Sequence, residues 1–175
     1  MSGNEGFITD LFRHNTWANL KLLDACQNLG DEQLDANVPG TFGSIRDTLL
    51  HIVGAEVSYV HRVNGRLPGE PPEPGTFPSI DALKHDAEWC GDELLQLALN
   101  ATPTDIVEQT RRGTNVKYPL MCLMTQVINH ATEHRAQIAT ILTQQGIEPP
   151  DMSGWMYMTE IGQIEETTEA VSSGD

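Results

Sequence analysis

The sequence predicts an all-α protein, an antiparallel four-helix bundle with a long Pro/Gly-rich crossover loop between its second and third helices. Apolar residues recur at three- and four-residue steps in four long stretches, which is the period of amphipathic helices. One connecting segment, residues 64–79, holds five of the ten prolines and three glycines, too many for any regular element. Four helices joined with one long connection are typical of a helix bundle. The length of 175 residues is about that of one domain.

The first two helices are expected at residues 7–29 and 45–63. The apolar stripe of the first helix leads to Gly30, and glycine in this place is typical of a helix C-terminus. Ser44 and Asp47 precede and begin the second helix with the spacing of a capping box, although Glu or Gln is the usual partner. Apolar residues lie on more than one side of the second helix, so we expect it to be buried on several faces.

The third helix is expected at residues 80–100, after Ser79, and the fourth at residues 120–145. Pro119 stands at the start of the fourth helix and Gly146 after its end. Proline suits the first turn of a helix and glycine suits the position just past its last turn, so both boundaries are well marked.

Two segments are less regular than the four helices. Residues 104–118, "TDIVEQTRRGTNVKY", contain β-branched residues around "RRGTN", which is compatible with an irregular segment or with a short hairpin. Residues 155–162 are compatible with a short last helix. We therefore expect a single domain over residues 1–164 and a flexible acidic tail over residues 165–175.

The charge of the chain disfavours several classes of partner. Ten basic and 25 acidic residues give a net charge of −15, and no Lys or Arg follows Arg135. Such a chain repels phosphate backbones and anionic membranes, so we expect neither a nucleic-acid nor a membrane partner. No stretch approaches the roughly 18 apolar residues of a membrane span, and the first residues do not resemble a signal peptide. A cytoplasmic protein is predicted.

The three cysteines are predicted to be reduced core residues. Cys26, Cys90 and Cys122 are odd in number, far apart in the sequence and placed within apolar segments. This arrangement is not that of a disulfide framework or of a CxxC site, and a catalytic thiol is the weaker alternative.

Two histidines, His130 and His134, lie four residues apart in the "NHATEH" segment of the fourth helix. At about 100° per residue, His134 falls within the apolar stripe and His130 at its edge, so both rings face the interior. Both must find partners away from water, and one metal ion bound at about 2.0–2.1 Å is a shared solution. Hydrogen-bonded core histidines are the alternative.

A third ligand has to come from another helix, because two histidines make a weak metal site. His51 is the best candidate, since it lies mid-helix among apolar residues with no other polar group to satisfy it. A hydrogen bond at a seam between helices is the alternative. His14, His61 and His85 lie beside charged residues or near helix ends, and we expect them to be solvated.

Glu56 falls in the centre of the apolar stripe of the second helix. A buried carboxylate must be paired, protonated or used beside a metal, where it can hold a ligand histidine in place. Glu56 is a candidate for that supporting role. A buried hydrogen bond to Asn15 or Asn19, which interrupt the stripe of the first helix, is an equal alternative. The sequence assigns no catalytic residue and no other cofactor-binding residue.

Three segments, "NTWAN", "GSIRDTLLHIVGAE" and "NHATEHRAQIATILTQQGIEPPD", resemble the DinB/YfiT-like family of metal-dependent four-helix-bundle proteins. Their order and spacing cover nearly the whole chain, and one departure is Ala136, where many members have glycine. In that family three histidines bind a divalent ion, commonly zinc or nickel. They map here onto His51, His130 and His134, so the resemblance implies a metal site at these residues.

The resemblance also implies a class of reaction. Characterised relatives are similar to S-transferases or isomerases that use a small thiol such as bacillithiol, mycothiol or glutathione, and many members have no known reaction. Three neutral histidines leave a dication with an open position, where coordination deprotonates a thiol. We therefore expect a small-molecule substrate, a low-molecular-weight thiol as co-substrate and, as in the family, a homodimer.

Two alternatives to a thiol-dependent enzyme stay open. In one, the metal only ties helices together in a non-catalytic, stress-related binding protein. In the other, "HATEH" is the H-x-x-E-H pattern of a metallopeptidase with Glu133 as general base. The peptidase is disfavoured because it needs a further acidic ligand far downstream, where this chain offers only a short acidic tail.

Overall fold

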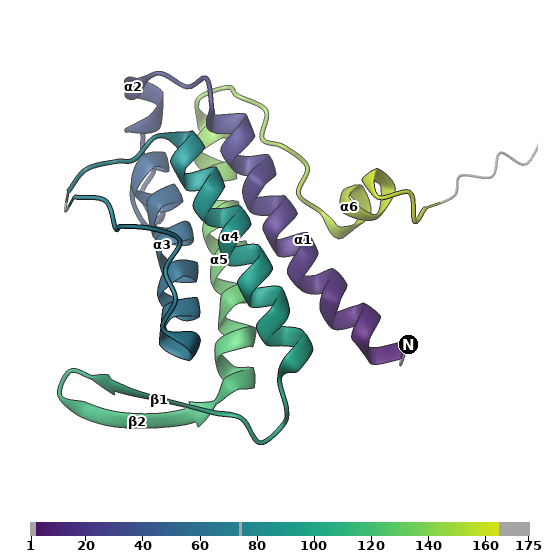
Figure 1. Ribbon diagram of the computed structural model, residues 1–175. Coiled ribbons are helices and arrows are strands. Elements are labelled where there is room, and N and C mark those ends of the chain that lie inside the picture. The colour runs from purple at the N-terminus through teal and green to yellow at the C-terminus, as the bar shows by residue number, and fades with distance from the viewer. Residues whose placement is uncertain (1–2, 74, 165–175) are drawn as a thin grey trace, which may run out of the picture.

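The computed structural model describes residues 3–73 and 75–164, and in them the chain forms six helices and one β-hairpin (Figure 1). The elements in order are α1 (Gly3–Cys26), α2 (Asp31–Leu34), α3 (Ile45–Asn64), α4 (Ile80–Asn100), β1 (Ile106–Arg111), β2 (Thr114–Pro119), α5 (Leu120–Gln144) and α6 (Gly154–Glu160). The protein is mostly helical, as predicted, and a two-stranded sheet is added. The expected acidic tail, residues 165–175, lies outside the described residues.

Four long helices form the body of the protein. Helices α1 and α3 each pack against both α4 and α5. In Figure 1, α1 and α5 run in one direction and α3 and α4 in the other. Because α3 and α4 run the same way, the chain between them must travel back along the helices, which accounts for the long connection at residues 65–79. None of the described helices combines the length and apolar character needed to span a bilayer.

The helix boundaries follow the predicted signals except in α1, which begins at Gly3 and not at the predicted residue 7. At the start of α3, Ser44 Oγ accepts from the backbone N–H of Asp47 at 3.1 Å, and the Asp47 carboxylate accepts from the N–H of Ser44 at 3.3 Å. The capping box therefore forms with Asp in place of Glu. Helix α1 ends at Cys26, earlier than predicted, because the chain turns after it and forms the short helix α2, which buries Leu34.

The segment left open between an irregular stretch and a hairpin is a hairpin. Strands β1 and β2 pair antiparallel over their full length, with Ile106 opposite Pro119. Arg112 and Gly113 form the turn with φ of 50° and 76°, the positive values that a tight two-residue hairpin turn requires. The hairpin lies at one end of the long helices, where β1 contacts α3 and β2 contacts α5 (Figure 1).

The cysteines only partly follow the prediction. Cys26 and Cys90 are fully buried, and burial raises the pKa of the Cys26 thiol to about 12. Cys122 is exposed, so the prediction of a core position was wrong for this residue. It lies in the first turn of α5, on the side of that helix that faces a cavity beside the hairpin. Cys122 is thus a free thiol open to solvent.

Gly91 lets α4 approach α1 closely, and its replacement is expected to destabilise the fold. A Cβ atom placed at Gly91 would overlap the side chain of Thr16, whose hydroxyl donates to Phe12 O at 3.1 Å. For Gly91→Ala we expect the free energy of unfolding to fall, because overpacking costs about 1–3 kcal/mol while alanine returns only about 1 kcal/mol of helix propensity.

Urea unfolding measures this difference, with Gly54→Ala as the matched control. Gly54 lies inside α3 and has open space where its Cβ would be, so alanine there is expected to stabilise by about 0.5–1 kcal/mol. Equal stabilisation by both substitutions would show that the contact between Gly91 and Thr16 does not limit the packing of α1 on α4.

Candidate metal centre

Three histidines from two helices converge at one point between α3 and α5. His51 comes from α3, and His130 and His134 come from adjacent turns of α5. One ring nitrogen of each lies within 4.8 Å of those of the other two, and Nε2 of His130 is 2.9 Å from Nε2 of His51. His134 is buried and the other two are half-buried. The structure thus brings together the three residues that the sequence singled out.

The donor set fits a divalent metal ion. A tetrahedral ion with bonds of about 2.0–2.1 Å keeps its ligand atoms about 3.3 Å apart, a spacing that small ring movements reach from here. Nδ1 of His130 is buried without a hydrogen-bond partner among the described residues, so hydrogen bonds do not fully satisfy the cluster. Imidazole nitrogens suit zinc and nickel alike. The three residues can therefore hold such an ion, and its identity is not fixed by the donors.

Burial keeps His51 and His130 neutral. Burial and, second, the neighbouring His134 lower the pKa of His51. Burial, followed by His134 and His51, lowers the pKa of His130 to about 4. At neutral pH both rings are therefore uncharged, and each has one nitrogen lone pair available for a metal.

Gln137 fixes which nitrogen of His134 carries the proton. Its Oε1 accepts a hydrogen bond from the backbone N–H of Phe42 at 3.0 Å and lies 3.0 Å from Nδ1 of His134. A backbone N–H can only donate, so the amide oxygen faces both groups. Nδ1 of His134 must then be the protonated nitrogen, and Nε2 keeps the lone pair that a metal needs.

Phe42 covers the cluster from the loop between α2 and α3. Its ring stacks on His51 with centroids 4.0 Å apart and planes 14° apart, and it meets His134 edge-on at 5.2 Å. The bond from its N–H to Gln137 holds this loop against α5. Phe42 is nevertheless 51% exposed, which suits a side chain that shields a site at the surface.

A buried polar network lies beside the histidine cluster. Asn15 and Asn19 each donate Nδ2 to Oε1 of Glu56, at 2.8 and 2.9 Å. Nη1 of Arg135 donates to Oδ1 of the same two asparagines, at 2.9 and 2.6 Å. Of the two alternatives for Glu56, the bond to the asparagines is the one that forms, and the hydrogen bonds of Glu56 in the described chain include none to a histidine.

Most of the chain matches one protein family. The family model described as "DinB family" matches residues 1–167. The chain belongs to the DinB family. Among curated proteins, "Protein DinB" of Bacillus subtilis (strain 168) is 23% identical over 170 residues, covering 88% of this chain and 96% of that protein. Family membership thus confirms the resemblance seen in the sequence, and the histidine cluster is a feature of this DinB-family chain.

Sequence reasoning missed two residues of this DinB-family site. Gln137 lies in the segment "NHATEHRAQIATILTQQGIEPPD" but was given no role, although it lies three residues after His134, one helical turn away. Phe42 was given no role either, and it lies between the first two predicted helices. Nothing in the sequence places Phe42 over a histidine, because that contact depends on how the loop folds back onto α5.

The peptidase alternative finds no support in this geometry. Glu133 is exposed on α5, and among the described residues no acidic side chain joins the three histidines as a further ligand. A general base has to reach the proton it removes within hydrogen-bond distance. Glu133 is instead exposed to solvent, and its charge acts on His130 only through space.

The remaining histidines lie outside the site. His61 and His85 are exposed, as expected. The expectation was wrong for His14, which is half-buried and has Nε2 2.9 Å from the carbonyl oxygen of Met152. The reason is α6, which folds back against α1 and packs Tyr157 on the ring of His14.

Removal of the Gln137 amide is expected to weaken metal binding without abolishing it. Gln137→Ala frees the ring of His134 and its tautomer, and loss of such a supporting contact costs about 10–100-fold in metal affinity. Competition with a chromophoric chelator measures the dissociation constant. Gln144→Ala, an exposed glutamine near the end of the same helix, is the matched control. Equal affinities of the two variants would show that Gln137 does not position His134.

Proposed function

We propose that this protein binds zinc or nickel at His51, His130 and His134 and acts as a thiol-dependent S-transferase or isomerase on a small-molecule substrate. The observation that carries the proposal is the convergence of three ring nitrogens within 4.8 Å. Two of the three histidines also line a solvent-open cavity of about 1150 Å³, which offers room for reactants. A buried structural ion has no need of such a cavity.

The residues of the site perform simple tasks in this proposal. When bound, a divalent ion lowers the pKa of a thiol so that the nucleophilic thiolate is present at neutral pH. The three histidines are neutral ligands, and they leave the positive charge of the site uncancelled and one position open. Gln137 keeps Nδ1 of His134 protonated, and Phe42 shields the cluster from water on one side.

Conjugation of monochlorobimane tests the reaction. A small thiol loses its proton to buffer, its sulfur forms a bond to the bimane carbon, and chloride leaves. The fluorescent product is expected to form faster with metal-loaded protein than with metal-free protein or with His130→Ala, for at least one thiol in a panel of bacillithiol, mycothiol, glutathione and cysteine. Equal rates for all thiols would overturn the proposed activity.

A non-catalytic role is the second candidate, because the histidines come from two helices. An ion shared by α3 and α5 would tie these helices together and stabilise the fold, as structural metal sites do. Metal-dependent stability together with equal conjugation rates is the result expected for this alternative.

We also infer the family's antiparallel four-helix bundle, a homodimer and a cytoplasmic location. The bundle is supported by four long helices that pack on one another. The dimer and the compartment rest on the family resemblance and on the acidic composition. Sedimentation equilibrium over a range of protein concentrations tests the dimer.

A further inference from the structure

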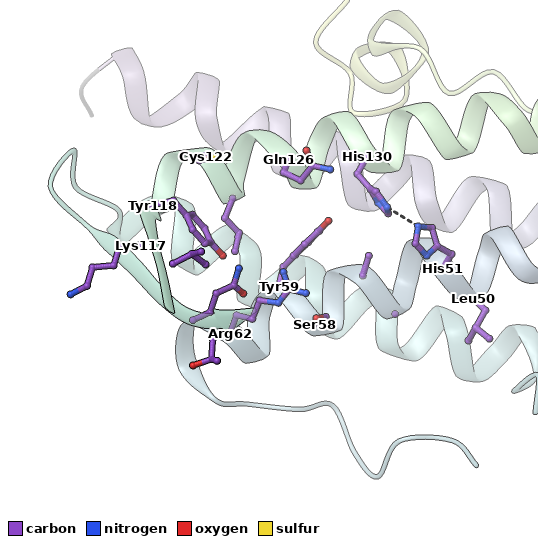
Figure 2. A pocket seen from close by; sticks show the side chains of 16 residues that line it. Leu50, His51, Ser58, Tyr59, Arg62, Lys117, Tyr118, Cys122, Gln126 and His130 are labelled. Carbon is purple, nitrogen blue, oxygen red and sulfur yellow. Dashed lines mark hydrogen bonds between the residues drawn. The ribbon is translucent and has the colours of Figure 1, made fainter. Parts of the chain in front are cut away.

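The cavity beside the histidine cluster has an uneven charge. It lies between α3, α5 and the hairpin, with the histidines at one end and the hairpin at the other (Figure 2). Its volume of about 1150 Å³ exceeds the roughly 300–1,000 Å³ of common ligand pockets. The chain has 25 acidic residues, and none of those in the part that the structure describes lines this cavity, whereas Arg62 and Lys117 do. The cavity is therefore a cationic region in an acidic protein.

Arg62 is the free positive charge of this cavity. Nζ of Lys117 is 2.6 Å from a carboxylate oxygen of Glu108, and in Figure 2 its side chain points away from the cavity. Arg62 forms no ion pair and no hydrogen bond within the described chain, and its guanidinium lies 5.4 Å from the centre of the Tyr59 ring. By contrast, the chain neutralises Lys21, Arg46, Arg66 and Lys84 with nearby carboxylates.

The other walls of the cavity suit a small polar ligand. Tyr59, Tyr118 and Gln126 present a hydroxyl or amide group, and Leu50 and Leu123 supply apolar surface. In Figure 2 the hydroxyl end of Tyr59 points into the space between Gln126 and His130. A guanidinium with five fixed donors pairs with a planar carboxylate through two parallel hydrogen bonds. Arg62 thus has the chemistry of an anchor for one end of a ligand.

We propose that this cavity binds a small carboxylate-bearing molecule, with the carboxylate on Arg62 and the remainder of the molecule extending toward His51 and His130. The placement of its other end at the histidines rests on the proposed function. The carboxylate can belong to the thiol co-substrate or to the electrophile, because both must meet at the histidine cluster. The chemistry that Arg62 recognises is the same in either case.

Protection of Cys122 tests the carboxylate site without metal or turnover. Cys122 lines the cavity and is exposed, whereas Cys26 and Cys90 are buried, so iodoacetamide is expected to modify Cys122 alone. In metal-free protein, succinate is expected to slow this alkylation in a saturable way, and its neutral diamide is not. Mass spectrometry follows the extent of modification. Equal protection by succinate and its diamide would overturn the proposal.

Three arginine variants locate the effect. In Arg62→Gln the succinate concentration for half protection is expected to rise at least tenfold, which corresponds to about 1.4 kcal/mol. Arg62→Lys keeps the charge and is expected to retain part of the protection. Arg112→Gln removes an exposed arginine at the hairpin turn that has no ion pair within the described residues, and it is expected to leave protection unchanged. The same succinate dependence in Arg62→Gln and wild type would contradict the proposal.

Conjugation kinetics with metal-loaded protein distinguish the two sources of the carboxylate. If the thiol carries it, Arg62→Gln raises KM for mercaptosuccinate but not for 2-mercaptoethanol. If the electrophile carries it, the same variant raises KM for iodoacetate but not for iodoacetamide. Succinate protection without any conjugation would leave the carboxylate site in place and remove the proposed function. Conjugation without succinate protection would leave the proposed function in place and remove the carboxylate site.

Discussion

His134→Ala is expected to abolish stoichiometric metal binding and the stability that the metal provides. A ligand present at about 100 times its dissociation constant stabilises the fold by about 2.7 kcal/mol. For a chain of this size that energy corresponds to a rise of about 5–10 °C in melting temperature. Elemental analysis of the purified protein measures bound metal, and calorimetry with and without added zinc or nickel measures the shift. In His134→Ala both the bound metal and the rise in melting temperature should vanish.

The same result is expected for His51→Ala and His130→Ala, because each removes one of three ligands. His85→Ala is the control, since His85 is exposed on α4 and outside the cluster. It should keep the wild-type metal content and melting shift. A wild type purified without metal that gains no stability from zinc or nickel would refute the site. So would a His130→Ala variant that still binds the ion stoichiometrically.

Local sequence signals located this candidate site, although it joins two helices. His130 and His134 share a helix, so the helical period alone places both rings on one face. His51 comes from another helix and was found because an imidazole among apolar side chains needs a partner. The distance of 2.9 Å between Nε2 of His51 and Nε2 of His130 depends on how α3 and α5 pack. No local sequence pattern encodes that packing.

The features that the sequence did not resolve depend on tertiary contacts or on weak local signals. The hairpin had competing interpretations, because strand propensity depends strongly on context and a two-stranded hairpin is marginal without packing. Here β1 and β2 contact α3 and α5. The ends of the long helices were easier to predict, because capping groups such as Ser44 act within a few residues.

Arg135→Met is expected to lower the free energy of unfolding by about 3–5 kcal/mol, the usual cost of breaking a buried charged network by removing one partner. The guanidinium donates to Oδ1 of both Asn15 and Asn19 and to Oγ1 of Thr132, and all three acceptors lose this donor. Burial lowers the pKa of Arg135 to about 10, so it is still charged at neutral pH. Urea unfolding measures the effect.

Arg13→Met is the control for this substitution. Arg13 is exposed on α1, and a surface change of this kind is expected to stay within about 0.5 kcal/mol of wild type. A loss in Arg135→Met no larger than that of the control would show that the network contributes little to the stability of the fold.

The pH dependence of stability separates the charge of Glu56 from its hydrogen bonds. Burial raises the pKa of Glu56 above 4.5, while Asn15, Asn19 and Arg135 oppose this rise. Above pH 4.5 the unfolded chain therefore loses a proton that the folded protein keeps, so wild-type stability falls as the pH rises. Glu56→Gln has no carboxyl group to titrate at this position. Its free energy of unfolding should therefore rise relative to that of wild type as the pH increases over that range.

The double variant Arg135→Met/Glu56→Gln shows whether the two charges act as a unit. Without Arg135 the pKa of Glu56 rises further, so the loss of stability with pH should be steeper in Arg135→Met than in wild type. Adding Glu56→Gln to Arg135→Met should remove this pH dependence. The double variant should then be more stable by about 0.5–3 kcal/mol than the sum of the two single losses in free energy of unfolding predicts. Strictly additive losses with parallel pH profiles would mean that the asparagines, and not the charges, hold α1, α3 and α5 together at this point.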